Sequence, residues 1–353
     1  MKYHLPFTLA NWPYSRRINP HYANVKPEAK AWVESFTPLN PKAQEAFNRC
    51  DFNLLASLAY PDLLPERLRT ACDLMNLFFI FEEYSDDQTS MDVQNVRAAI
   101  MRGLRSPDKP HAITNKASLV GEMYRQFWCR ATARGHPVAH QRFVDAFDLY
   151  TTAVVEEAVA RESGKVHNGV NEYLALRRDT IGTKPSFALL EFDQEEVLPL
   201  DVIRHPSVQE LVTTATDMLS IDNDICSFNV EQARGDIHNI VIVVMHSQHL
   251  SLSSALTFVE SIHARLLNKF IALSSELPSW GEPIDSRLAN YIAGLGNWVR
   301  ANDAWCFESE RYFGCQGREV QAHRIVTILP SLVPPRRLPD YTDWEDVEGE
   351  LKN

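Results

Sequence analysis

One segment of the sequence places oxygen-bearing side chains at helical spacing. Asn223, Ser227 and Glu231 follow one another at intervals of four residues within NDICSFNVE. In an α-helix this spacing stacks the three side chains along one stripe. Amide, hydroxyl and carboxylate oxygens are the hard donors that Mg²⁺ prefers, and Mg²⁺ commonly shares its coordination with substrate phosphates. The segment therefore indicates a magnesium site, although a polar stripe facing solvent would show the same pattern.

A second acidic cluster ends the segment LMNLFFIFEEYSDD. Glu82 and Asp86 are four residues apart, as are Glu83 and Asp87, so either pair can face one neighbour. A solvated helix end is the ordinary explanation of such a run. However, residues 77–81 are too apolar on every side for a surface helix. We therefore expect a buried helix that ends in a cation-binding carboxylate cluster, with Glu82 and Asp86 as the favoured pair.

The composition favours an all-α protein. The 353 residues are 45% apolar and include only 13 glycines, and long stretches lack the period-two alternation of exposed strands. Residues 1–40 are rich in Pro, Asn and aromatics, which predicts an irregular arm. The predicted helices cover residues 42–59, 65–86, 91–103, 116–133, 138–162, 170–181, 206–229, 234–247, 252–276 and 284–313.

A single domain accounts for this pattern. No Gly/Ser linker, shift in composition or internal repeat divides the chain. We expect one helical domain over residues 1–330, on which the arm of residues 1–40 packs. Residues 331–353 are broken by prolines and then acidic, which predicts a C-terminal tail.

Charge and motifs argue against several classes of function. Lys and Arg number 35 against 46 Asp and Glu, and the net charge of −11 repels nucleic acid and anionic membranes. There is no GxGxxG or GxxxxGK[ST] loop, no CxxC spacing among the six cysteines, and no apolar run long enough for a membrane span or signal peptide. We expect a cytoplasmic protein, a monomer or homodimer, that binds a small molecule and neither nucleic acid nor membrane.

The two acidic segments together resemble the metal-binding motifs of class I terpene synthases, particularly the fungal (basidiomycete) sesquiterpene synthases. In that family a D(D/E)xxD motif and an (N/D)DxxSxxxE motif on two facing helices hold three Mg²⁺ ions around the farnesyl diphosphate head group. The resemblance implies a single-domain helical bundle around an apolar cavity, with Mg²⁺, or alternatively Mn²⁺, as cofactor. The metal ligands it implies are Glu82, Glu83, Asp86, Asn223, Ser227 and Glu231. Glu82 stands where the family usually has Asp, and Asp87 offers a spare carboxylate.

Two further segments extend the resemblance. YLALRRDTIGT resembles the part of the family that carries the diphosphate-sensing arginine. The family places this arginine 46 residues before the Asn of the second motif, and 223 − 46 = 177 implies Arg177, with the neighbouring Arg178 as the alternative. WVRANDAWCFESERYF resembles the family's late helix, which ends in an Arg–Tyr pair, here Arg311 and Tyr312. The four residues Arg177, Arg178, Arg311 and Tyr312 are the implied catalytic set.

Aromatic residues supply a candidate substrate pocket. Trp298, Asn302, Trp305, Ser309 and Tyr312 follow one another at steps of 4, 3, 4 and 3, which predicts one helix face. Core packing alone explains most such stripes. In a terpene synthase the same face can also hold the prenyl chain and offer aromatic π-faces to carbocations. The substrate-binding residues implied are Phe78, Phe79, Trp298, Asn302 and Trp305.

The resemblance implies a sesquiterpene synthase, a lyase that ionises farnesyl diphosphate with Mg²⁺, releases diphosphate and cyclises the allyl cation in an apolar pocket. FTLANWPYSRRINPHY and FNVEQARGDIHNIV look most like the fungal group that joins C1 to C11 through a humulyl cation and forms products such as Δ6-protoilludene. Two alternatives stay open. A chain-elongating prenyltransferase shares the fold but needs two aspartate-rich motifs. A non-catalytic helical interaction protein would explain the departure at Glu82.

Overall fold

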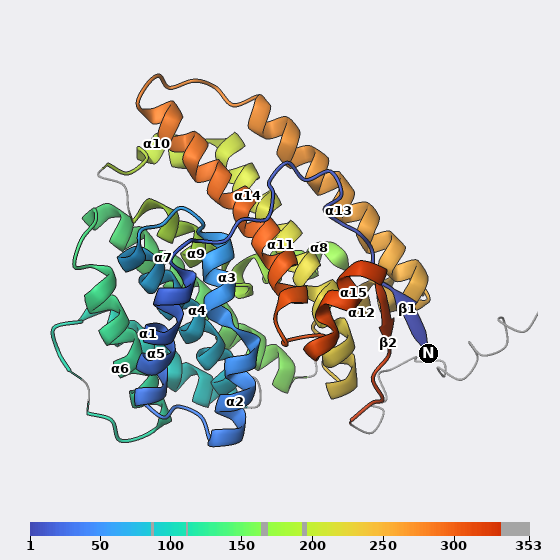
Figure 1. Cartoon of the computed structure of the whole chain (residues 1–353), viewed down its shortest axis with the longest axis horizontal. Helices are drawn as coiled ribbons and strands as arrows, with labels where there is room; N and C mark the ends of the chain where they lie inside the picture. The colour runs from blue at the N-terminus through green and yellow to red at the C-terminus, as the bar shows by residue number, and fades with distance from the viewer. Residues whose placement is uncertain (86–87, 111, 164–168, 193–195, 333–353) are drawn as a thin grey trace, which may run out of the picture.

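The computed structural model describes residues 1–85, 88–110, 112–163, 169–192 and 196–332. In this part of the chain nearly all regular structure is α-helical, as the sequence predicts (Figure 1). The α-helices are α1 (Tyr22–Ser35), α2 (Pro41–Cys50), α3 (Phe52–Ala59), α4 (Pro65–Ser85), α5 (Ser90–Arg105), α6 (Lys116–Ala131), α7 (Pro137–Glu162), α8 (Val170–Thr180), α9 (Thr183–Ala188), α10 (Leu200–Ile203), α11 (Pro206–Arg234), α12 (Ile240–Ser247), α13 (Leu252–Ser275), α14 (Ile284–Glu308) and α15 (Gly317–His323). Short 3₁₀ turns η1 (Leu189–Glu191) and η2 (Gly314–Gln316) and two strands, β1 (Lys2–His4) and β2 (Ile325–Thr327), complete the described elements.

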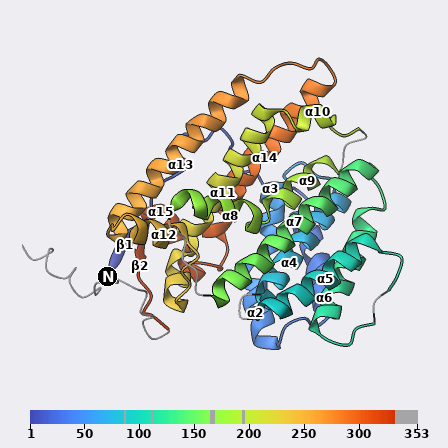
Figure 2. The same cartoon turned by 180° about the vertical axis from the view of Figure 1, so that it is seen from behind.

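One continuous apolar core joins these helices. Helix α11 runs beside both α13 and α14 in one half of the molecule, and α4, α5, α6 and α7 form much of the other half (Figures 1 and 2). The cluster of buried apolar side chains runs from Tyr3 to Val326 and includes residues of both halves. Glu82 and Glu83 of the first motif lie on α4 and the second motif lies on α11, so the core fixes each motif helix against its neighbours.

Helix α4 is buried on nearly all sides, which confirms the prediction from its apolar flank. Every residue from Thr70 to Phe78 is buried. The helix ends at Ser85, so Glu82 and Glu83 lie in its last turn. Carboxylates are unfavourable at the negative end of the helix dipole, and this helix end therefore favours a cationic neighbour. Asp86 and Asp87 lie outside the described residues.

Helix α11 is longer than the sequence pattern predicts and carries the whole second motif. It begins at Pro206, a residue suited to a first helical turn, and ends at Arg234 rather than at residue 229. Gly235 follows with φ of 75°, a left-handed conformation that glycine adopts without steric cost. Glu231 therefore lies inside the helix, in register with Asn223 and Ser227.

Two other predicted boundaries are wrong for local reasons. The predicted helix 42–59 is broken at Asp51, where φ is 47° and the side chain accepts a hydrogen bond from Leu54 N at 3.2 Å to begin α3. The predicted arm contains helix α1, although Pro27 lies within it. Its buried residues Val25, Ala29 and Val33 repeat every four residues, a helical signal that the surrounding prolines and asparagines obscured.

The N-terminal arm crosses the body and joins the C-terminal strand. Strands β1 and β2 pair antiparallel, with Tyr3 opposite Val326. Farther along the arm, Trp12 Nε1 donates to Gly296 O at 3.0 Å. A Cβ atom at residue 296 would lie 2.2 Å from Tyr14 Cε2, so a larger residue at this position would displace the Tyr14 ring from α14.

In the described part of the chain no single helix has both the length and the apolar character of a membrane span. Helices α12 and α13 meet these criteria of length and composition only together, and they join at a bend of 113°. The cytoplasmic location and the domain limits stay predictions from the sequence.

Candidate active site

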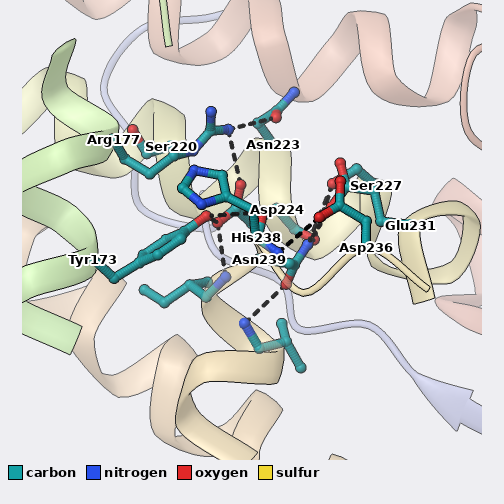
Figure 3. Close-up of polar contacts among 12 residues, drawn as sticks. Tyr173, Arg177, Ser220, Asn223, Asp224, Ser227, Glu231, Asp236, His238 and Asn239 are labelled. Carbon is teal, nitrogen blue, oxygen red and sulfur yellow. Dashed lines mark hydrogen bonds and ion pairs between the residues drawn. The ribbon is translucent and has the colours of Figure 1, made fainter. Parts of the chain in front are cut away.

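The second motif occupies one stripe of α11. Asn223 and Glu231 are half-buried and Ser227 is buried, and their side chains follow one another along the helix (Figure 3). The predicted stacking follows directly from the uninterrupted helix. The oxygens of these side chains are hard donors that suit Mg²⁺.

Arg177 and Arg178 point to different partners. Arg177 Nη2 donates to Asn223 Oδ1 at 3.1 Å and to Asp224 Oδ1 at 2.9 Å (Figure 3). Arg178 instead forms a two-bond ion pair with Asp217 at 2.7 and 2.8 Å. Burial is the largest single effect and opposes the charge of Arg177, but the neighbouring acidic groups, Asp224 foremost, together outweigh it, and the pKa of the guanidinium lies above its usual value. The structure thus brings Arg177, and not Arg178, to the second motif.

Asp224 is a site residue that the sequence analysis did not single out. Its side chain is buried and accepts hydrogen bonds from Tyr173 Oη and from Ile240 N, the latter at 2.9 Å, in addition to Arg177. One carboxylate therefore ties α8 and the start of α12 to α11. Its place directly after Asn223, within the NDxxSxxxE pattern, was the signal that could have identified it.

Asn239 holds the other end of the motif. Its Nδ2 atom donates to Glu231 Oε2 at 2.9 Å, to Ser227 Oγ at 3.4 Å and to the backbone of Asp224 at 2.7 Å (Figure 3). The predicted helix 234–247 would have placed Asn239 in a helix interior. Instead it is the N-cap of α12 and accepts from Val241 N at 2.9 Å. An Asn immediately before an apolar run is the usual sequence signal for such a cap.

The Glu231 carboxyl lies in an environment that favours a cation. Burial, followed by the negative charges of Asp236 and Asp224, raises its pKa to about 8. The ionised form is therefore costly without a positive neighbour. A bound cation would reverse this effect because it stabilises the carboxylate.

The first motif contacts the Arg–Tyr pair. Arg311 Nη2 donates to Glu82 Oε1 at 2.6 Å, and Arg311 Nη1 lies 3.8 Å from Glu83 Oε1. Burial again opposes the charge, but the neighbouring acidic groups, Glu82 foremost, together outweigh it and raise the pKa of Arg311. The next residue, Tyr312, accepts a hydrogen bond from Asn223 Nδ2 at 2.9 Å. Two consecutive residues thus connect the first motif to the second.

The aromatic residues near the motifs form a stack, but not the helix face that the spacing predicts. Helix α14 ends at Glu308, so Ser309 and Tyr312 lie beyond it. The Tyr312 ring still contacts Trp305, with centroids 5.7 Å apart. The Phe79 ring also lies near Trp305, with centroids 5.7 Å apart. Phe52 of α3 stacks on Phe79 at 3.7 Å and was not predicted, because α3 carries no motif.

The other predicted pocket residues lie farther apart. Phe78 points toward α7, where it stacks on Phe147 with centroids 5.5 Å apart. Successive residues on a helix leave it about 100° apart, which separates Phe78 from Phe79. Trp298 is buried beside Tyr60, at a centroid distance of 5.4 Å. Among the described residues, Trp298 Nε1 and Asn302 Nδ2 are buried without a hydrogen-bond partner.

The side chains of the second motif suit a metal ion that is coordinated partly by oxygens of its substrate. In the described ranges no three His, Cys, Asp or Glu side chains converge on a metal site of their own. The second motif instead mixes one carboxylate with an amide and a hydroxyl, and Mg²⁺ typically completes such a set with water and phosphate oxygens. Arg177 Nε is buried and has no partner within the part of the chain that the structure describes, which suits an anionic ligand at this position.

The chain is similar to known proteins over most of its length. Residues 73–269 match the family model described as terpene synthase family 2, C-terminal metal binding. The chain is 47% identical to a Δ6-protoilludene synthase of Armillaria gallica over 340 residues, which cover 96% of this chain and 97% of that protein. It is 45% identical to a Δ6-protoilludene synthase of Stereum hirsutum over 97% of each chain.

Solved structures show the same fold. The crystal structure of a-eudesmol synthase superimposes with a TM-score of 0.75 and 18% identity, over 85% of this chain and 98% of that chain. Germacradien-4-ol synthase from Streptomyces citricolor gives a TM-score of 0.71 and 22% identity, over 83% and 98% of the two chains. At such low sequence identity, the structural similarity is evidence for the fold alone.

Proposed function

This chain belongs to the terpene synthase family, and from that premise we propose that it converts farnesyl diphosphate into Δ6-protoilludene with the aid of Mg²⁺. It is a sesquiterpene cyclase, a lyase that acts on a prenyl diphosphate. The observation that carries the proposed product is the identity of 47% over nearly the whole of both chains with a Δ6-protoilludene synthase. The contacts of Arg311 and Tyr312 with the two motifs support the proposed site.

The two motifs would hold the metal. The ligands that we propose are Glu82, Glu83, Asp86, Asn223, Ser227 and Glu231. Three Mg²⁺ ions bound there would neutralise charge on the leaving diphosphate and so promote heterolysis of the C–O bond. Glu82 reaches Arg311 with its longer side chain, so a Glu at this position is compatible with a site between the two helices.

The arginines of the chain bind and orient the diphosphate. Arg177 and Arg311 lie at opposite motifs, and each offers a planar fork of donors that matches phosphate oxygens. Tyr312 adds a hydroxyl group next to Asn223, from which it accepts a hydrogen bond. We propose that these three groups grip the head group and fix the direction in which the prenyl chain enters.

The aromatic stack shapes the hydrocarbon. Phe79 and Trp305 lie next to the first motif and Tyr312, so the allylic end of the chain would meet their π-faces after ionisation. A dry aromatic wall delays capture of the cation by water and permits the C1–C11 bond to form. The second motif differs from the second aspartate-rich motif of chain-elongating prenyltransferases, and no described contact favours that function.

The test is to incubate the purified protein with farnesyl diphosphate and Mg²⁺ and to analyse the volatile extract by gas chromatography–mass spectrometry. An EDTA control and a second reaction with added isopentenyl diphosphate complete the design. We expect metal-dependent Δ6-protoilludene. Formation of another humulyl-derived hydrocarbon would contradict the proposed product but not the cyclase activity. Formation of a longer prenyl diphosphate would contradict the assignment as a cyclase.

A further inference from the structure

The C-terminal segment Ile325–Leu332, which we term the clasp, lies along the last two turns of α11. Asn229 Nδ2 donates to Thr327 O at 3.0 Å, and Asn229 Oδ1 accepts from Leu329 N at 2.9 Å. The carboxamide of Asn229 is buried and makes both bonds that a neighbouring strand would make. A side chain of the motif helix thus takes the place of a strand partner.

Two further bonds continue the contact toward the helix end. Gln232 Nε2 donates to Leu329 O at 3.0 Å. Leu332 N donates to Ala233 O at 2.7 Å. The last carbonyl groups of a helix have no hydrogen-bond partner within the helix, and the clasp supplies a donor to one of them. The contact therefore extends to the turn in which α11 ends.

The bonded stretch of α11 surrounds a proposed metal ligand. Glu231 lies between Asn229 and Gln232, and α11 ends three residues later, at Arg234. Asn229 precedes Glu231 by two residues, so the two side chains leave the helix on opposite sides. The clasp accordingly holds the helix from the face opposite the ligand stripe.

Polar bonds, rather than apolar burial, hold the outer part of the clasp. Val326 is buried and anchors β2 beside β1. Beyond it, Leu329 is 43% exposed and Leu332 is 74% exposed. These side chains bury little apolar surface. The main effect of the hydrogen bonds of residues 329–332 is therefore to hold the end of α11 in its helical conformation.

We propose that the clasp is a positioning element of the metal site and that Asn229 and Gln232 are its positioning residues. Helix ends fray, and Glu231 is only one turn from the end of α11. By keeping this turn wound, the clasp holds Glu231 in register with Ser227 and preserves the geometry of the ligand stripe. The metal-binding part of the proposal rests on the proposed function.

The test compares Asn229→Ala and Gln232→Ala with a matched control, Gln209→Ala. Gln209 lies in the first turn of α11, where its Nε2 donates to Ile203 O at 2.7 Å, the same kind of bond at the opposite end of the helix. One readout is the Mg²⁺ concentration that gives half of the thermal stabilisation by Mg²⁺ and inorganic diphosphate. The other is hydrogen exchange of the amides of residues 231–235 in metal-free protein.

We expect both clasp variants to raise the Mg²⁺ midpoint by about 10-fold and to speed exchange at residues 231–235, and the control to do neither. A lower melting temperature with an unchanged Mg²⁺ midpoint would overturn the proposal, as would an equal effect of the control. If Asn229→Ala does not fold, Gln232→Ala decides alone. Wild-type protein without any stabilisation by Mg²⁺ and diphosphate would contradict the proposed function instead, while the exchange rates would still test the clasp.

Discussion

The guanidinium of Arg311 donates a hydrogen bond from Nη2 to Glu82 Oε1 at 2.6 Å. The proposed metal ligand of the first motif is therefore already neutralised by a cation of the chain. A metal ion bound at this motif would compete with Arg311 for Glu82, whereas a bound diphosphate would attract Arg311 and leave Glu82 available. Binding of metal and binding of diphosphate should each favour the other.

Arg311→Gln should separate the two roles of this side chain. Mg²⁺ alone should bind the variant more tightly, because Glu82 loses its competing cation. Turnover of farnesyl diphosphate should fall by about 100-fold, the typical effect of removing one donor that stabilises developing charge. Titration calorimetry with Mg²⁺ and steady-state kinetics measure the two effects. Unchanged turnover would contradict the role of Arg311 in diphosphate binding.

Arg177→Lys and Arg178→Lys form a matched pair. Lysine keeps the charge but not the planar fork, so Arg177→Lys should lower kcat by about 100-fold. Arg178 pairs with Asp217 and does not contact the motif, so Arg178→Lys should change kcat by less than about threefold. Equal losses in kcat would mean that both arginines contact the diphosphate.

Glu82→Asp introduces the residue usual for the family. If the motif can bind metal with either an Asp or a Glu side chain at this position, turnover should stay within about threefold of wild type. This corresponds to a change of less than about 1 kcal/mol in the activation barrier. The shorter side chain should also weaken the contact with Arg311. Kinetics at several Mg²⁺ concentrations check this, and an inactive variant would show that the site requires the longer reach of Glu82.

Phe79→Leu and Phe81→Leu distinguish a pocket residue from a core residue on the same helix. Phe79 stacks on Phe52 near Trp305, and its loss should alter the ratio of hydrocarbon products more than the rate of ionisation. Phe81 packs toward Tyr150 and is fully buried, so its substitution should cost about 1 kcal/mol of stability and leave the products unchanged. Chromatography of the products and thermal unfolding provide the comparison.

Asp303→Asn should stabilise the protein near neutral pH. Burial, followed by the charge of Asp222, raises the pKa of Asp303 to about 6, although Arg300, Arg324 and His263 oppose the shift. For an acid with a raised pKa in the folded state, stability is greatest below the unfolded value of 3.8 and falls as pH rises through about 6. The variant should therefore gain up to about 3 kcal/mol at pH 7 and little at pH 4. Denaturant unfolding at both pH values measures the gain, and equal gains at both would contradict the assignment.

The sequence by itself determined the local features of the site. The four-residue spacing of Asn223, Ser227 and Glu231 places them on one stripe of any uninterrupted helix. The apolar residues around α4 require burial, whatever the partner. These features depend on helical periodicity and burial, which act over a few residues.

Only the tertiary structure decided which side chains meet. Arg311 and Glu82 are 229 positions apart in the sequence, and their contact depends on the packing of every helix between them. The same holds for the contact of Asn229 with Leu329. The ends of helices also escaped the pattern, because α14 stops at Glu308 where the chain turns extended, and no periodic signal marks that turn. Periodicity specifies the face that a residue occupies, whereas the partner on that face is chosen by the global packing that buries the most apolar surface with its polar groups satisfied.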